Sequence, residues 1–192
     1  MSNLELIAVH NDTELYKQSP NHEDEEYGLH RVPTFVFERN GEEIARIVEK
    51  PVTSLTTDIG QIAAGFAPKN SYAGVSILQD FFEVVSVDSL ESIPKEIFNE
   101  VYREVIFVGE LTTFAKKLDT EGKATHAEFV YKMNTKIFKY HPYPYYRLGR
   151  FYFEQGQYEL AKEAFYKTAE IEPDYQNKCQ YIVDLKEKLT EQ

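Results

Sequence analysis

Residues 32–48 decide the fold of the first part of this chain, and they read VPTFVFERNGEEIARIV. Two apolar, partly alternating runs flank Asn40-Gly41, which is the strongest short signal for a β-hairpin because a type I′ turn needs positive φ at both central residues. Pro33 cannot donate a hydrogen bond to a sheet, so it belongs just before the first strand. The stretch therefore predicts two antiparallel strands joined at Asn40-Gly41.

With its flanks, this stretch resembles the second half of a thioredoxin domain. In that family a cis-proline after Val, Ile or Thr opens an antiparallel strand, an x-Gly turn follows, and a last helix closes the domain. The resemblance runs from about Leu4 to Gly65. Residues 4–9 look like the central strand of the family, and residues 12–27 would hold the next helix and its loop. Residues 54–64 look like the last helix, whose expected packed face is Leu55, Ile59, Ile62 and Ala63.

The resemblance implies a cis bond between Val32 and Pro33. In thioredoxins the backbone of the residue before the cis-proline meets an extended substrate peptide, so Val32 and Pro33 would be a peptide-binding edge. The alternative is a turn that only orients the hairpin. Both interpretations stay open at the level of the sequence.

The cysteines depart from the family. A thiol–disulfide catalyst needs an attacking thiolate and a resolving thiol, usually in Cys-x-x-Cys, but this chain has one cysteine, Cys179, and no Trp. We predict an ordinary helix position for Cys179 and no catalytic residue. Because Met1, Ser2 and Asn3 alone precede Leu4, we expect a truncated, redox-inactive form. Its sheet edges would be open, which favours self-association.

Composition excludes several classes of function. The chain has 192 residues, 42% of them hydrophobic, and a net charge of −11, which argues against nucleic acid and anionic membranes as partners. No apolar run is long enough for a membrane span, and no signal peptide is visible, so we expect a cytoplasmic protein. The acidic run 21–26 is expected to be a solvated loop or helix start. The five histidines show no metal spacing, and we predict no metal and no cofactor.

A linker rich in turn formers is expected at residues 67–74, and residues 75–85 favour a short helix. After Pro94, apolar residues recur at steps of three and four as far as Leu118, which predicts one amphipathic helix ended by Gly122. Thr125-x-x-Glu128 predicts a capping box for the next helix, to about Tyr140. Residues 141–144, His-Pro-Tyr-Pro, break that helix.

The stretch after this break resembles a tetratricopeptide repeat, a pair of closely packed helices. The residues at the matching positions are Tyr145, Leu148, Gly149, Tyr152, Ala161, Phe165 and Pro173. Residues 155–157 would form the turn of the pair. One period of about 34 residues upstream, a degenerate repeat matches at Leu111, Phe114, Ala115, Leu118, Ala127 and Tyr131. Residues 175–189 would form a terminal helix.

We therefore expect an α/β plus all-α fold: a partial thioredoxin-like domain over residues 1–66, a linker and short element over 67–93, and a tetratricopeptide-like helical region over 94–192. The expected function is that of a thioredoxin-family protein, inactive in thiol–disulfide exchange as written. The alternative is a non-catalytic module whose helical repeat binds a protein or peptide. Tyrosines near Tyr145 would either line a binding groove or fill the core.

Overall fold

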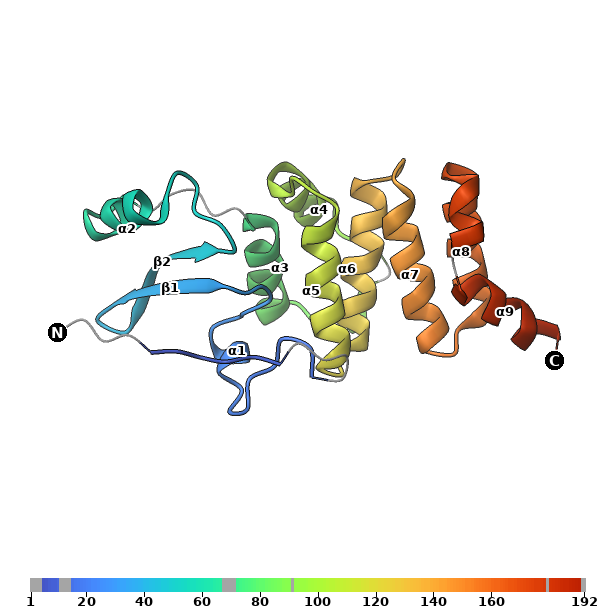
Figure 1. Cartoon of the computed structure of the whole chain (residues 1–192), viewed down its shortest axis with the longest axis horizontal. Helices are drawn as coiled ribbons and strands as arrows, with labels where there is room; N and C mark the ends of the chain where they lie inside the picture. The colour runs from blue at the N-terminus through green and yellow to red at the C-terminus, as the bar shows by residue number, and fades with distance from the viewer. Residues whose placement is uncertain (1–4, 11–14, 67–71, 91, 179, 191–192) are drawn as a thin grey trace.

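A small β-hairpin followed by a row of helices makes up the protein (Figure 1). The computed structural model describes residues 5–10, 15–66, 72–90, 92–178 and 180–190. The coarse expectation of an α/β part followed by an all-α part is confirmed. No helix within these ranges combines the length and the apolar character that crossing a membrane requires.

The predicted hairpin is present as β1 (Thr34–Arg39) and β2 (Glu42–Val48). Asn40 and Gly41 join the strands with φ values of 58° and 84°, as a type I′ turn requires. Thr34 lies opposite Val48, and the register slips after Phe37, so that Ile44 bulges out of the ladder. The strand predicted at residues 4–9 was wrong for the described residues 5–10, which have no strand beside them to pair with; Leu4 lies outside the described residues.

The helix predicted over residues 54–64 forms α2 (Leu55–Ala63). Ser54 caps it by accepting from the backbone N–H of Thr57, and the Asp58 carboxylate accepts from the N–H of Val52 at 2.6 Å. Ile62 is buried as expected, but Leu55 and Ile59 are each 40% exposed and Ala63 is exposed. Of the four residues predicted to form the packed face of α2, Ile62 alone is buried.

The acidic run gives one helical turn, α1 (Glu23–Glu26), where a longer helix was expected within residues 12–27; residues 11–14 are not described. The expectation that this run is solvated fails at Asp24, which is fully buried. Its Oδ2 lies 3.0 Å from Nζ of Lys117, and Ser19 donates to its Oδ1 through both N–H and hydroxyl. Asp24 is buried because it forms an ion pair with Lys117, a partner far away in the sequence that the local acidic run does not indicate.

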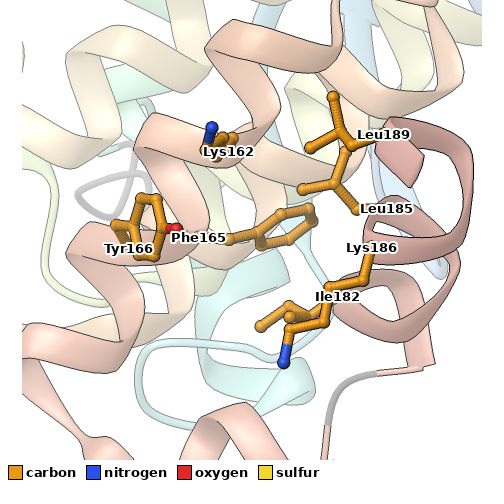
Figure 2. Close-up of a pocket in the computed structure, with 7 residues that line it drawn as sticks. All are labelled: Lys162, Phe165, Tyr166, Ile182, Leu185, Lys186 and Leu189. Atoms are coloured by element: carbon orange, nitrogen blue, oxygen red, sulfur yellow. The ribbon is translucent and has the colours of Figure 1, made fainter. Parts of the chain in front are cut away.

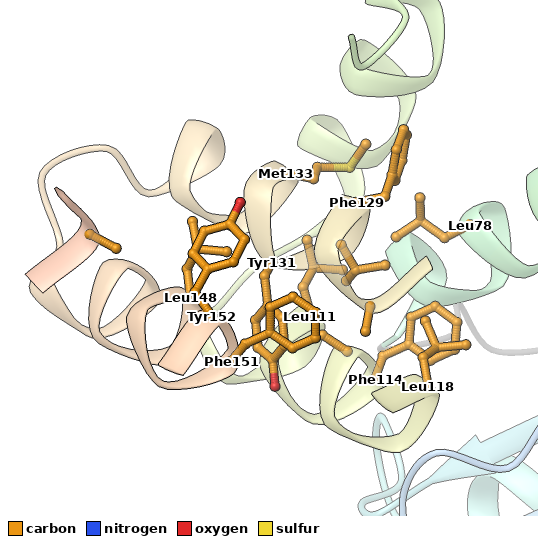
Figure 3. Packing of buried hydrophobic residues seen from close by; sticks show 14 of the residues in the cluster. Leu78, Leu111, Phe114, Leu118, Phe129, Tyr131, Met133, Leu148, Phe151 and Tyr152 are labelled. Carbon is orange, nitrogen blue, oxygen red and sulfur yellow. The ribbon is translucent and has the colours of Figure 1, made fainter. Parts of the chain in front are cut away.

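The remaining elements are helical and enclose one hydrophobic core (Figure 3). They are α3 (Ala73–Val84), η1 (Val87–Ser89), α4 (Lys95–Glu104), α5 (Gly109–Thr120), α6 (Ala124–Ile137), α7 (Pro142–Glu154), α8 (Tyr158–Ile171), η2 (Pro173–Lys178) and α9 (Gln180–Thr190). Short turns at Gly122 and Gly156, with φ of 75° and 73°, join α5 to α6 and α7 to α8. Two helical hairpins thus stand side by side (Figure 1).

Several helix boundaries differ from the prediction. Of the expected linker 67–74, residues 67–71 are not described, and Ala73 and Gly74 begin α3. The single helix expected to reach Leu118 is two helices, because residues 105–108 (Val-Ile-Phe-Val) are weak helix formers and Val105 turns extended where it packs on Gly74.

The second hairpin also begins and ends differently from the prediction. The capping box is wrong, since α6 starts at Ala124 directly after the tight turn at Gly122. α6 ends at Ile137, and the expected terminal helix 175–189 divides into η2 and α9.

Candidate functional site

The peptide bond between Val32 and Pro33 is cis, as predicted, and lies directly before β1. Val32 is 38% exposed, and Pro33 is exposed as well. The Pro33 carbonyl accepts from the N–H of Glu49 at 2.7 Å, which ties the loop to the end of β2. The predicted edge residues therefore share one accessible loop at the start of the hairpin.

Arg31 connects this loop to the helical part of the protein. Its Nη1 lies 3.0 Å from Oε1 of Glu49, and its Nη2 donates to the Gly109 carbonyl at 2.7 Å. The guanidinium carbon lies 5.5 Å from the centre of the Tyr72 ring and 5.8 Å from that of Phe107. One side chain thus joins the loop to β2, to the start of α3 and to the start of α5.

Glu49 and Tyr72 complete this group, which we name the Arg31 clamp (Arg31, Glu49 and Tyr72). The Tyr72 hydroxyl donates to Oε2 of Glu49. Burial by itself would raise the pKa of Glu49, but the hydrogen bonds from Tyr72 and Arg31 hold that pKa below its ordinary value. Burial and the Glu49 carboxylate together raise the pKa of Tyr72. Glu49 therefore stays a carboxylate and Tyr72 a phenol at neutral pH.

Two buried titratable groups lie beside the clamp. His30 packs edge-on against Tyr72 and Phe114, with ring centres 5.5 and 5.9 Å apart, and burial lowers its pKa to about 3, so the ring is neutral. Glu110 is fully buried, and burial raises its pKa to about 7, although the N–H groups of Gly74, Val75 and Ile106 face its carboxylate and oppose that rise. Neither group lies open to a substrate, so both are structural.

Accessible apolar side chains occur in the loop, on the hairpin and on α2. They are large apolar residues between 37% and 40% exposed: Val32, Phe35, Ile44, Leu55 and Ile59. β1 has β2 as its strand neighbour, and no second neighbouring strand exists in the described part of the chain. An open strand edge beside apolar side chains is a surface on which an extended chain can pair.

The residues predicted to pack the helical hairpin do come together. A Cβ on Gly149 would lie 2.7 Å from Cε1 of Phe165, and Leu148 and Ala161 are buried. The Tyr152 hydroxyl donates to Oε1 of Glu128 at 2.8 Å. The Tyr145 hydroxyl reaches the Thr135 carbonyl at 3.3 Å. Pro173 is exposed and begins η2. The other residues are packing residues, with Tyr152 in the core and Tyr145 half-buried, whereas the predicted packing residue Pro173 is exposed.

A small apolar pocket of about 60 Å³ lies between α8 and α9 (Figure 2). It is lined by Lys162, Phe165, Tyr166, Ile182, Leu185, Lys186 and Leu189. Its size fits the tip of one apolar side chain, and the two ammonium groups point away from it in opposite directions (Figure 2). The pocket therefore lacks the convergent polar groups of a small-molecule site.

Potential metal ligands do not cluster in the part of the chain that the structure describes. No group of three or more His, Cys, Asp or Glu there could hold a metal ion. Cys179 lies outside the described residues. The sequence did not indicate Arg31, Glu49 or Tyr72 as site residues, because nothing in their local sequence marks residues that meet across the fold.

No protein-family model, curated protein or solved structure matches this chain.

Proposed function

We propose that this chain is a thioredoxin-like protein that binds an extended peptide along Val32, Pro33 and β1. The observation that carries the proposal is the exposed Val32–Pro33 loop at an open strand edge, which the Arg31 clamp joins to the end of β2 and to the helices. A rigid loop lowers the entropy that binding costs, because the peptide meets a surface already in place.

Recognition would combine the backbone with apolar contacts. A peptide strand added to the free edge of β1 would exchange N–H and C=O hydrogen bonds, which give affinity without sequence preference. Val32 and Phe35 would supply apolar contact for its side chains. Thiol–disulfide exchange is not part of this function for the sequence as written, since Cys179 would have to attack and resolve alone.

A second candidate is a protein-binding module made by the helical region. It is favoured by the two adjacent hairpins α5–α6 and α7–α8, with the close Gly149–Phe165 contact that resembles a tetratricopeptide repeat. The two candidates use different surfaces, so one protein can carry both.

Fluorescence anisotropy with a labelled, S-carboxymethylated insulin B chain tests the first candidate. We expect binding that Val32→Asp weakens about tenfold, because a buried charge replaces an apolar contact at the edge. Val84→Asp is the matched control, since Val84 is 81% exposed at the end of α3. Absence of binding, or equal loss in both variants, would remove the proposal.

A further inference from the structure

We propose that β1 pairs with β1 of a second copy of this chain, so that two hairpins form one four-stranded antiparallel sheet. This interface goes beyond the proposed function, because it gives the strand edge a different occupant and does not require that any peptide binds there.

The hydrogen bond at the start of the hairpin shows which residues of β1 face β2. The Pro33 carbonyl accepts from the N–H of Glu49 at 2.7 Å, so the backbone of Pro33 faces β2. Successive residues of an antiparallel strand direct their backbone groups to alternate sides. Phe35 and Phe37, which lie opposite Ile47 and Ala45, therefore bond to β2 as well.

The residues between them direct their backbone N–H and C=O groups away from β2. These outward residues are Thr34, Val36 and Glu38. Within the ranges that the structure describes, β1 has no strand on this side, and no backbone hydrogen bond from another segment reaches the three residues. The outer edge of β1 is therefore a row of backbone donors and acceptors ready to pair with another strand.

The outer edge of β2 is less suited to pairing. Its ladder is interrupted at Ile44, which bulges, and Glu42, Glu43 and Arg46 place charges along it. Bulges and charged side chains are the features that protect edge strands from pairing with other chains. In contrast, the bulge leaves β1 regular, and residues 34–37 of β1 carry no charge. We therefore assign the interface to β1.

β1 is complementary to itself in one symmetric register. A two-fold axis at Val36 places Val36 opposite Val36 of the second copy. Phe35 then lies opposite Phe37 of the second copy, and Thr34 lies opposite Glu38. All three outward residues pair with one another in this register, two aromatic pairs form on one face, and no like charges lie opposite each other. An axis at Phe35 or Phe37 would instead pair an outward residue with the loop or the turn.

The second copy supplies strands that the hairpin lacks. A two-stranded sheet is marginally stable in water, whereas three or more strands with an apolar face are stable. Phe35 is 40% exposed in the single chain and gains an aromatic neighbour in the pair. One pair of strands is a small interface, and each chain carries a net charge of −11, so we expect a dissociation constant of about 100 μM.

Sedimentation velocity of the full chain, over concentrations from about 1 to 300 μM, tests the interface. The average mass should rise from one chain toward two, and added sodium chloride should strengthen the dimer because it screens the repulsion between the two acidic chains. Saturating S-carboxymethylated insulin B chain should dissociate the dimer, since both occupy the edge of β1.

Val36→Pro is the most specific variant, because it removes an outward N–H and leaves the bonds between β1 and β2 in place. It should weaken the dimer at least about tenfold. Phe35→Ser should weaken it through the aromatic pairs, and it decides alone if circular dichroism shows that Val36→Pro is unfolded. Val84→Ser is the matched control, since Val84 is an exposed apolar residue at the end of α3.

The outcomes separate this interface from the peptide site. A chain that stays monomeric at all concentrations would overturn the interface, and the anisotropy measurement would still decide peptide binding. A dimer that survives Val36→Pro or Phe35→Ser in folded form, that Val84→Ser weakens equally, or that stays intact with the peptide bound would place self-association on another surface and also overturn the proposal.

Discussion

Gly149→Ala tests the packing of the second helical hairpin, because the contact with Phe165 decides whether the substitution raises or lowers the free energy of unfolding. Gly149 lies inside α7, where alanine is favoured over glycine by about 1 kcal/mol in helix propensity. The added methyl would lie 2.7 Å from Cε1 and 2.8 Å from Cδ1 of Phe165, a ring that is 3% exposed. Overpacking of this kind costs about 1–3 kcal/mol. We therefore expect a net loss of about 1 kcal/mol, or about 2–4 °C in melting temperature.

Gly60→Ala is the matched control, because Gly60 lies inside α2 and a Cβ there meets nothing within 4 Å. It should stabilise α2 by up to about 1 kcal/mol. Urea unfolding followed by circular dichroism measures both changes. In the Phe165→Leu background the cost of Gly149→Ala should shrink, since the smaller side chain makes room. If Gly149→Ala stabilised the protein as much as Gly60→Ala does, the close contact between α7 and α8 would be wrong.

Three further predictions follow from charge and cysteine content. The pKa of Glu110 is raised from 4.5 to about 7, so the unfolded chain loses this proton first, and the free energy of unfolding should fall between about pH 4.5 and 7 by about 3 kcal/mol. Urea titrations at pH 5 and 8 should show this loss in the wild type and not in Glu110→Gln; a loss of equal size in both would contradict it. Asp24→Asn should destabilise by about 1–3 kcal/mol, measured by urea unfolding, because it removes one of the two carboxylates paired with the buried Lys117 ammonium and leaves Glu121 as the other; no measurable effect would refute a buried pair. Insulin reduction by dithiothreitol should proceed at the uncatalysed rate with the chain present; acceleration that survives Cys179→Ser would show a catalytic route beyond the single thiol.

Local signals explain what the sequence predicted. Asn40-Gly41 sets a hairpin turn whatever lies around it, and the residues before and after it set the strands. The repeat spacing predicted the contact between Gly149 and Phe165 and the burial of Ala161, because a helical hairpin brings such positions together. The boundaries near Val105 and Ala124 were predicted less well, since packing on Gly74 and the turn at Gly122 decide them.

Long-range electrostatics explain what the sequence could not predict. Arg31 meets Gly109, 78 residues away, and Gln18 meets Thr120, 102 residues away. Asp24 looks like one member of a solvated acidic run until Lys117 is placed beside it.

The most direct measurement is the change in backbone amide chemical shifts when the S-carboxymethylated insulin B chain is added to isotope-labelled protein. A peptide that binds along the cis Val32–Pro33 loop and the free edge of β1 should move the amides of residues 31–38 most, and leave those of α7 and α8 in place. Val32→Asp should suppress these changes at the same peptide concentration. Shifts centred on the helices, or none at residues 31–38, would contradict a peptide-binding edge at Val32 and Pro33.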